Sequence, residues 1–302
     1  MAKILSFGSL NVDHVYHVSH MVQPGETISA KSLKFFCGGK GLNQSIALAR
    51  AGAAVCHAGA VGKSDGDFLL DTLTKSGVST EHVRMLDCPS GHAVIQVDAS
   101  GQNCIMIYGG ANREITEEQV ECTISQFSPG DYLVLQNEIS CIRDLMEAAH
   151  RQRMRIVFNP SPIDETIAAL PLELCDYILL NEVEAQSLCP GAEAENMLPE
   201  LQKRFPNTDI VLTLGVEGAC YCSAKTGQTI RQGSYTVPVK DTTAAGDTFT
   251  GYFIAAMAAQ LPPERALRLA SVAAGLAVSR EGAEASIPQM EEVEKLEKMW
   301  HL

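Results

Sequence analysis

The chain of 302 residues lacks any run of basic residues, and its formal net charge at pH 7 is −13. Proteins bind nucleic acids largely through lysines and arginines that neutralise phosphates, and basic segments also favour anionic membranes. This composition therefore argues against nucleic-acid and membrane partners. It still allows a small anionic ligand, because backbone amides at the start of a helix bind phosphate without basic side chains.

The sequence also lacks a CxxC pair and a long apolar segment near its start. Its ten scattered cysteines predict buried, reduced thiols rather than a disulfide framework. The opening residues, MAKILSFGSLNVD, contain a short apolar run that soon meets polar residues. This pattern predicts a first β-strand and neither a signal peptide nor a membrane anchor, so we expect a cytoplasmic protein.

Two short patterns lack the residues that would complete a functional motif. Gly62-Lys63-Ser64 resembles the end of a P-loop, but His57 stands where that motif needs its first glycine. His14, His17 and His20 would not share one face of an extended segment, and no nearby cysteine or acid completes a metal site. We therefore expect neither a P-loop nor a histidine metal site.

The chain does contain short aliphatic runs that alternate with longer helical patterns. The expected strands are Lys3–Gly8, Ala54–Ala60, Tyr132–Gln136, Arg155–Asn159, Tyr177–Leu180 and Ile210–Leu214. The expected helices are Gly41–Ala51, Gly66–Lys75, Glu117–Gln126, Arg143–Gln152, Glu182–Leu188, Ala245–Gln260, Pro263–Arg280 and Met290–Met299. This alternation predicts an α/β fold in which helices cover both faces of a mostly parallel sheet. Ligands of such sheets bind at the carboxyl ends of the strands.

Two regions, 14–36 and 92–108, interrupt this alternation. The first contains the turn signal Pro24-Gly25, and the second has the pattern of a hairpin around Ser100-Gly101. We expect both to join a small β-sheet that is either a moving lid or a static extension. An exposed apolar face of this sheet could pair with another subunit. The large domain would then comprise residues 1–13, 37–91 and 109–302.

Two motifs near the amino terminus suit a polyhydroxylated ligand. In FCGGKGLNQSIALARAG, residues 36–52, consecutive glycines allow a close approach to a ligand, and Asn43 offers both a donor and an acceptor. In GSLNVDH, Asn11 and Asp13 follow the first strand, where an aspartate can accept two hydroxyl hydrogen bonds. The alternatives are an ordinary glycine-rich turn before a helix and a turn-forming Asn/Asp pair.

Two further motifs follow predicted strands. Asn181 and Glu184 could hold a hydrated Mg²⁺ ion beside phosphates, or they could form a helix capping box. In the segment 213–218, Gly215 and Gly218 form a turn that can lie under a nucleotide, or a hairpin turn into residues 219–223. Both interpretations remain open for each motif.

The segment DTTAAGDTFTGYF, residues 241–253, places an acid where a tight turn enters a helix. The amides around Ala244, Ala245 and Gly246 would point out of the helix together and form an anion hole. Asp247 beside them could accept a proton from an attacking alcohol. The alternative is that Asp247 is a simple helix cap.

Two long segments, GGKGLNQSIALARAG and DTTAAGDTFTGYF, resemble the two signatures of the PfkB carbohydrate-kinase family, and the similarity extends from GSLNVDH to REGAEASIP. The resemblance implies a three-layer α/β fold with a small β-lid that often forms a homodimer clasp. It also implies ATP-dependent phosphorylation of a sugar primary hydroxyl, with D-ribose as the first candidate. Another sugar or a nucleoside is the alternative substrate, and a non-catalytic sugar-binding regulator is the alternative function.

The resemblance further implies the role of individual residues. Asp247 would be the catalytic base, and Ala244, Ala245 and Gly246 the anion hole for the γ-phosphate. The implied sugar contacts are Asn11, Asp13, Gly39, Lys40, Gly41, Asn43, Glu138 and Asp247. The implied nucleotide contacts are Asn181, Thr213, Gly215, Gly218, Gly246 and Ser271, the last standing where relatives often carry asparagine. Glu184 would organise Mg²⁺ through water, and an activating K⁺ would lie near Asp241, Thr243, Ala277, Arg280, Gly282 and Ser286.

Overall fold

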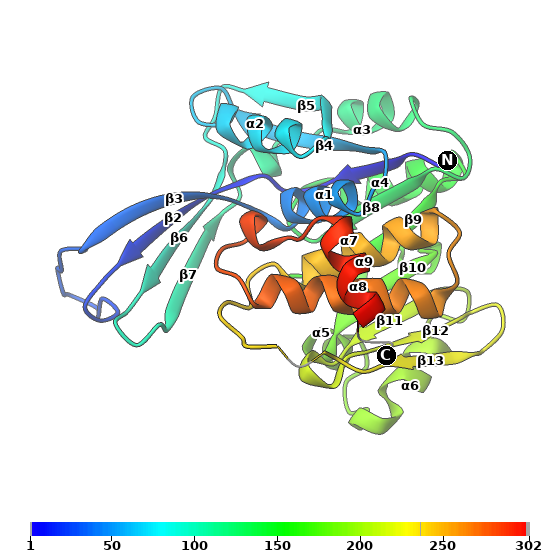
Figure 1. Ribbon diagram of the computed structural model, residues 1–302. Coiled ribbons are helices and arrows are strands. Elements are labelled where there is room, and N and C mark those ends of the chain that lie inside the picture. The colour runs from blue at the N-terminus through cyan, green and yellow to red at the C-terminus, as the bar shows by residue number, and fades with distance from the viewer. Residues whose placement is uncertain (1, 236, 300–302) are drawn as a thin grey trace.

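The computed structural model describes residues 2–235 and 237–299, and within them the chain forms a nine-stranded sheet and a four-stranded sheet (Figure 1). Positions 1, 236 and 300–302 of the predicted large domain lie outside the described residues. In spatial order, the large sheet contains β13 (Thr229–Gln232), β12 (Ala219–Cys222), β11 (Asp209–Thr213), β10 (Tyr177–Asn181), β9 (Arg155–Asn159), β8 (Tyr132–Gln136), β1 (Ile4–Phe7), β4 (Val55–Gly62) and β5 (Ser79–Leu86).

The strands from β11 to β5 are parallel, and β12 and β13 extend one edge in antiparallel pairs. The chain adds β4 and β5 on one side of β1, and β8 to β11 on the other. The strand order therefore reverses between β1 and β8. The carboxyl ends of strands at such a reversal form a crevice in which ligands bind.

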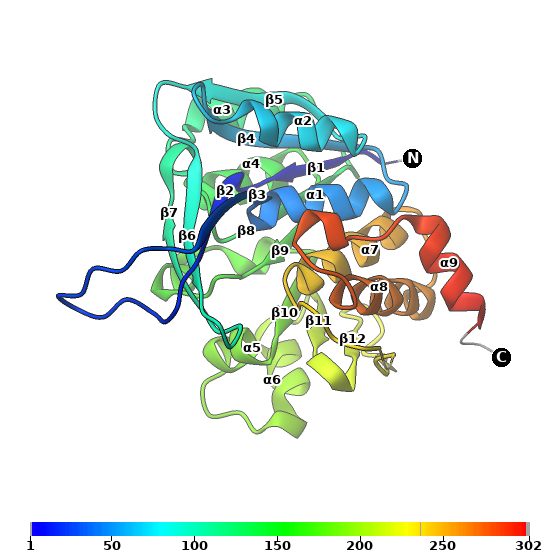
Figure 2. The same cartoon turned by 60° about the vertical axis from the view of Figure 1, so that its left-hand side comes forward.

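Helices cover both faces of the large sheet (Figure 2). One layer comprises α1 (Lys40–Arg50), α2 (Asp67–Lys75), α7 (Ala245–Ala258), α8 (Pro263–Val278) and α9 (Met290–Met299). The opposite layer comprises α3 (Glu117–Ile124), α4 (Ile142–Arg151), α5 (Glu182–Leu188) and α6 (Met197–Arg204). Successive strand residues face opposite layers: Val134 packs with the first group of helices, whereas Leu133 and Leu135 pack with the second. The three-layer α/β fold predicted from the sequence is confirmed.

The six strands predicted from the sequence are all present, but β5, β13 and α6 were not predicted. The β5 sequence, STEHVRML, mixes charged and apolar residues because it is an edge strand with partly exposed side chains. In α6, Pro199 suggests a break, yet proline is tolerated in the first turn of a helix, where it stands. Short 3₁₀ helices cover Gly110–Arg113, Glu165–Ala169, Leu172–Leu174, Ala194–Asn196, Gly215–Glu217 and Glu284–Ser286.

The four-stranded sheet has the order β3 (Ser32–Gly38), β2 (Asn11–His17), β6 (Gly91–Val97) and β7 (Asn103–Tyr108). It extends away from the helical layers (Figure 1), and its outer strands carry exposed apolar side chains such as Phe35 and Met106. The predicted small second sheet is therefore present, with β6 and β7 as the expected hairpin. Movement of this sheet as a lid stays a prediction.

The cysteines are all unpaired, but the prediction that they are buried is wrong for half of them. Cys104 on β7 and Cys122 on α3 are exposed. Cys88, Cys141 and Cys189 are partly exposed. In the described part of the chain, no helix has the length and apolar character needed to cross a bilayer.

The helices α1 and α7 pack closely at Gly251 in the middle of α7. A Cβ atom at this position would lie 2.4 Å from the Cβ of Ala47 and 2.8 Å from the backbone nitrogen of Leu48. A methyl group there would therefore push the two helices apart. By contrast, a methyl at Gly275 of α8 would have nothing within 4 Å among the neighbours described by the structure.

We predict that Gly251→Ala lowers the free energy of unfolding by about 1–3 kcal/mol, the usual cost of overpacking a core. Gly275→Ala is the matched control, and it should raise stability by about 0.5–1 kcal/mol through better helix propensity. Urea unfolding of both variants provides the measurement. Equal effects of the two substitutions would show that the close contact between α1 and α7 is absent.

Candidate active site

A pocket of about 240 Å³ lies at the carboxyl ends of β9, β10 and β11, against the start of α7. Parallel α/β sheets bind ligands on this carboxyl side, and the pocket lies beside the reversal between β1 and β8, at the neighbouring strands. The pocket is lined by Lys40, Asn159, Ser161, Leu179, Leu180, Asn181, Glu184, Thr213, Thr242, Ala244, Ala245, Gly246, Asp247 and Thr250. The structure thus brings together eight residues that the sequence nominated from four separate segments.

The first turn of α7 opens into this pocket. Ala244 precedes the helix in a left-handed conformation with φ of +58°, which is uncommon for a residue with a side chain. The amide of Ala245 donates to the carbonyl of Thr242 over 3.3 Å. The amides of Gly246 and Asp247 belong to the first turn, where N–H groups have no intrahelical partner. The positive end of the helix dipole therefore faces the pocket.

The carboxylate of Asp247 is buried and is held by two side-chain amides from α1. Asn43 Nδ2 donates to Oδ2 over 3.1 Å, and Gln44 Nε2 donates to Oδ1 over 3.0 Å. Asp247 is not the N-cap of α7, since Ala244 occupies that position. The alternative that Asp247 is a simple helix cap is therefore wrong. Its carboxylate lines the pocket instead.

Gln44 links Asp247 to two strand ends that the sequence analysis did not nominate. Its Nε2 also lies 3.3 Å from Asn159 Oδ1, and its Oε1 accepts from Gln136 Nε2 over 2.8 Å. Gln136 and Asn159 are the last residues of β8 and β9. A polar residue at a strand end is the same signal that singled out Asn181, so it could have found both.

Lys40 is the cation of this pocket. Burial by itself would lower the pKa of its ammonium group, but the carboxylates of Asp247, Glu138 and Glu184 outweigh burial, and the pKa is raised overall. The lysine is therefore charged and provides positive charge beside Asp247 and the open end of α7. A phosphate group that entered the pocket would meet both.

A second polar group surrounds the turn between β3 and α1. Gly38 and Gly39 are required there: a Cβ at Gly38 would lie 2.2 Å from Asp13 Oδ2, and Gly39 has φ of +93°. Burial, followed by the charge of Glu138, raises the pKa of Asp13 to about 7. Glu138 itself accepts hydrogen bonds from the backbone amide of Lys40 (3.1 Å) and from the hydroxyl of Ser9.

Asn11 and Asn43 complete this group. Asn11 begins β2, which also contains Asp13, so the alternative of a turn-forming Asn/Asp pair is wrong. Asn112 Nδ2 donates to Asn11 Oδ1 over 2.7 Å and fixes its orientation. Asn43 Oδ1 is buried and accepts no hydrogen bond within the described chain. Because buried acceptors are nearly always paired, this atom indicates where a ligand hydroxyl would donate. Gly41, the second residue of α1, donates its amide to Ser9 Oγ.

The nucleotide contacts implied by the resemblance are only partly brought together. Asn181 and Glu184 form a capping box at the start of α5, in which each side chain accepts from the backbone amide of the other. Gly215 and Gly218 form the turn between β11 and β12, so the hairpin alternative is confirmed. Gly215, Gly218 and Ser271 do not line the pocket. The Ser271 hydroxyl is buried in α8 without a hydrogen-bond partner among the described residues.

Of the residues implied for a monovalent cation, Asp241, Thr243 and Gly282 lie in contact. Asp241 Oδ1 accepts from the amide and hydroxyl of Thr243, and Oδ2 accepts from the amide of Gly282 over 3.0 Å. These hydrogen bonds outweigh the effect of burial and lower the pKa of Asp241. The Arg280 side chain pairs with Glu292. Ala277 and Ser286 are buried in α8 and in the following 3₁₀ turn.

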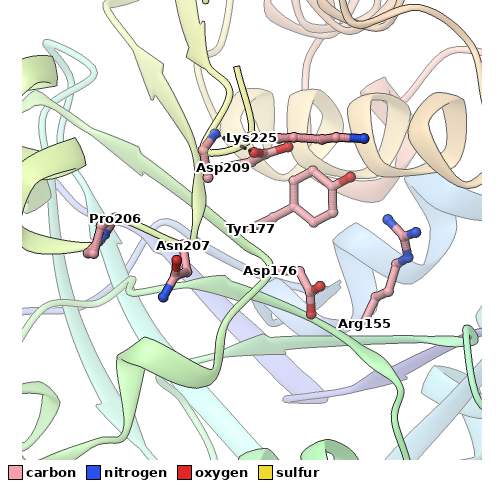
Figure 3. Close-up of a pocket in the computed structure, with 8 residues that line it drawn as sticks. Arg155, Asp176, Tyr177, Pro206, Asn207, Asp209 and Lys225 are labelled. Carbon is pink, nitrogen blue, oxygen red and sulfur yellow. Dashed lines mark hydrogen bonds between the residues drawn. The ribbon is translucent and has the colours of Figure 1, made fainter. Parts of the chain in front are cut away.

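A further pocket of about 240 Å³ lies at the opposite edge of the sheet, at the amino ends of β9, β10 and β11 (Figure 3). Its acidic groups already have structural partners. Asp209 accepts from the hydroxyl of Tyr221 and the amide of Ala224, and Asp176 accepts from the amide of Ile156. These carboxylates tie strand ends to loops, so the pocket at the carboxyl ends is the better candidate for chemistry.

Comparison with known proteins identifies the family of the chain. Residues 1–290 match the pfkB family carbohydrate kinases. The chain is 36% identical to the ribokinase of Staphylococcus aureus over 97% of its own length and 99% of the relative. It is 33% identical to the ribokinase of Haemophilus influenzae over 97% of each chain. The structure of Arabidopsis thaliana ribokinase complexed with ribose and ATP superimposes with a TM-score of 0.88 at 29% identity, over 98% of this chain and 99% of the other. The chain belongs to the PfkB family of carbohydrate kinases.

Proposed function

We propose that the protein transfers the γ-phosphoryl group of ATP to the primary hydroxyl, O5, of D-ribose. The observation that carries the proposal is the juxtaposition of a buried carboxylate, Asp247, with the open amides of α7 and the ammonium group of Lys40 in one pocket. Relatives of similar length at 33–36% identity are ribokinases, which supports ribose as the acceptor.

In this reaction Asp247 accepts the proton of the sugar hydroxyl as that oxygen attacks the γ-phosphorus. Asn43 and Gln44 hold its two oxygens, so the carboxylate keeps one orientation during the transfer. The amides at Ala244, Ala245 and Gly246 stabilise the negative charge that develops on the transferring phosphoryl group. Lys40 adds positive charge to the same pocket.

The sugar would lie between Asp247 and the second polar group. Asp13, Asn11 and Asn43 offer carboxylate and amide groups to several hydroxyls, which suits a free sugar better than an apolar base. Glycines 39 and 41 let the chain pass close to it. Glu138 would fix this wall of the site through its hydrogen bonds to Lys40 and Ser9.

Mg²⁺ and K⁺ belong to the same proposal. Each oxygen of Glu184 keeps a free lone pair beside its capping-box bonds and lines the pocket, so it suits a water-mediated contact to Mg²⁺. Bound Mg²⁺ would neutralise phosphate charge.

The carboxylate of Asp241 accepts a hydrogen bond from the amide of Gly282 and so ties the loop before α7 to Gly282, which supports a K⁺ site there. Equal turnover in K⁺-rich and K⁺-free buffer would refute the K⁺ site.

We predict that Asp247→Asn lowers kcat by about 10²–10⁴-fold, the usual contribution of a general base. The amide keeps the shape of the side chain, so ribose should still bind. Steady-state kinetics and calorimetric titration with ribose measure the two effects separately. Near-normal turnover in this variant would remove Asp247 from the role of base.

The raised pKa of Asp13 predicts that ribose binding depends on pH. Because this pKa is about 7, the carboxyl is protonated below that pH and ionised above it. The carboxylate accepts more hydroxyl hydrogen bonds than the acid, so affinity should rise as the pH increases through about 7. Calorimetric titration on both sides of this pH tests the prediction. Asp13→Asn should bind more weakly and without the pH dependence, and a constant wild-type affinity would contradict the role of Asp13.

The acceptor is tested by measuring ATP consumption with ribose, deoxyribose, fructose, nucleosides and sugar phosphates. Ribose should give the highest kcat/KM. A higher value for a nucleoside would favour the alternative acceptor. No ATP consumption with any acceptor would favour a sugar-binding regulator.

A cytoplasmic location, which suits unpaired cysteines, is also part of this proposal.

We further propose that the regions 14–36 and 92–108 serve as a lid and as the interface of a homodimer. Asp13, a candidate sugar contact, lies in one cross-strand row with Phe36, Ala93 and Ile107. If Asp13 contacts the sugar, the apolar residues of this row share the sugar-facing side of the sheet. Ile105 and Ile107 are more than half exposed on the edge strand β7. A second copy of the sheet would remove these side chains from water.

Substitution of Ile105 by aspartate tests the dimer. The wild-type protein should have twice the mass of the 32.5 kDa chain by light scattering, and Ile105→Asp should shift it towards the monomer. Val183→Asp is the control, because Val183 is an exposed apolar residue on α5, outside this sheet. A monomeric wild type would refute the interface.

A further inference from the structure

The edge strand β5 pairs with β4 through an irregular register near its start. Cys56 pairs with Ser79, but Ala58 pairs with His82, so β5 contains one more residue than β4 in this interval. Such an extra residue is a β-bulge, which redirects the side chains around it. The bulge lies two residues from the start of β4, at the amino-terminal edge of the sheet.

The bulge brings three metal-ligating side chains together. In a regular strand Glu81 and His82 would point to opposite faces of the sheet. Here Cys56 Sγ lies 3.7 Å from Glu81 Oε1, and His82 Nε2 also lies 3.7 Å from Glu81 Oε1. The sulfur, the nitrogen and the carboxylate oxygen all lie within 4.8 Å of one another.

Two of these three separations are close to those of a tetrahedral metal site. Zinc bonds of about 2.0 Å to nitrogen or oxygen and about 2.3 Å to sulfur imply ligand-to-ligand distances of about 3.3–3.5 Å in a tetrahedron. The two 3.7 Å contacts exceed this range by a few tenths of an ångström. The Glu81 side chain is 69% exposed and can rotate to shorten both contacts, whereas Cys56 Sγ and the His82 nitrogen, which lie within 4.8 Å of each other, would also have to approach on binding.

The combination of thiol, imidazole and carboxylate selects the class of ion. Calcium and magnesium prefer oxygen ligands, whereas thiolate and imidazole favour zinc and its neighbours in the transition series. We propose that Cys56, Glu81 and His82 bind a divalent transition metal ion of the zinc class, with water in the fourth position. Cys56 is buried and the His82 ring packs 5.9 Å from the ring of Phe127, so burial and packing restrict the positions of these two ligands. Glu81 reaches the ion from solvent.

The site is separate from the phosphoryl-transfer chemistry. Cys56 and His82 lie towards the amino ends of β4 and β5, whereas the candidate active site lies at the carboxyl ends of the strands. A bound ion joins the edge strand β5 to β4 and stabilises that edge of the sheet. Occupancy should therefore raise the melting temperature, and kinase activity should not require it.

Cobalt(II) is the probe, because it occupies zinc sites and its bond to a thiolate gives a charge-transfer absorption in the near ultraviolet. Nucleotide-free protein is first treated with a chelator and a reductant and dialysed, and is then titrated with Co²⁺. The wild type should show this absorption and saturate at one ion per chain. Zn²⁺ should displace Co²⁺, and Zn²⁺ alone should raise the melting temperature.

Three variants separate the proposed site from other thiols. Cys56→Ser should abolish the absorption, and His82→Gln should weaken Co²⁺ affinity by at least about tenfold. Cys220→Ser is the matched control, because Cys220 is also a buried thiol in the sheet but belongs to no cluster of three potential ligands within the described ranges. Its titration should equal that of the wild type. Circular dichroism of each metal-free variant establishes that it is folded.

Absence of the cobalt absorption in the wild type, or its persistence in Cys56→Ser, would overturn the proposal. Loss of the absorption in Cys220→Ser but not in Cys56→Ser would place the ion at another cysteine and would also overturn it. If Cys56→Ser does not fold, His82→Gln provides the decisive comparison: unchanged affinity in that variant excludes the site.

Discussion

The contact between α1 and α7 is the interaction on which the candidate active site depends. Asn43 and Gln44 of α1 donate to the two carboxylate oxygens of Asp247 in α7, although about two hundred residues separate them in the sequence. Gly251 allows this approach, because no larger residue fits against Ala47 and Leu48. The same packing thus builds the core of one helical layer and orients the proposed base.

Electrostatics explains how an acidic protein can bind a nucleotide. The chain has a net charge of −13, yet the pocket combines the charged Lys40 with the open end of α7. Backbone amides and the helix dipole provide positive potential without additional basic side chains. The nearby carboxylates of Asp247, Glu138 and Glu184 keep Lys40 protonated despite its burial. The negative charge around the pocket therefore keeps the ammonium group of Lys40 charged.

The carboxyl ends and the amino ends of the strands in the large sheet have different roles. At the carboxyl ends, Asn43 has a buried acceptor without a partner within the described chain, and Asp13 keeps an elevated pKa. These groups are costly in the free protein and would be satisfied by a ligand. At the amino ends, Asp176 and Asp209 are paired with backbone amides and a tyrosine. The polar groups of that edge serve the fold, and the bulge beside Cys56 adds a cluster suited to a metal ion.

The sequence by itself determined the α/β class, the strand-end motifs and the glycine-rich turns, because these depend on local periodicity and on residues next to each other in the chain. It nominated Asp247 as the candidate base for the same reason. The tertiary structure decided where these residues lie: Asn181 and Glu184 form a capping box that also lines the pocket, Asn11 and Asp13 lie in a strand, and Asp247 lies in the first turn of α7 without being its N-cap. It also decided that Gln44, Gln136 and Asn159 form one network with Asp247. That network depends on strand order and on helix packing, and a contact between residues so far apart in the chain leaves no local pattern in the sequence.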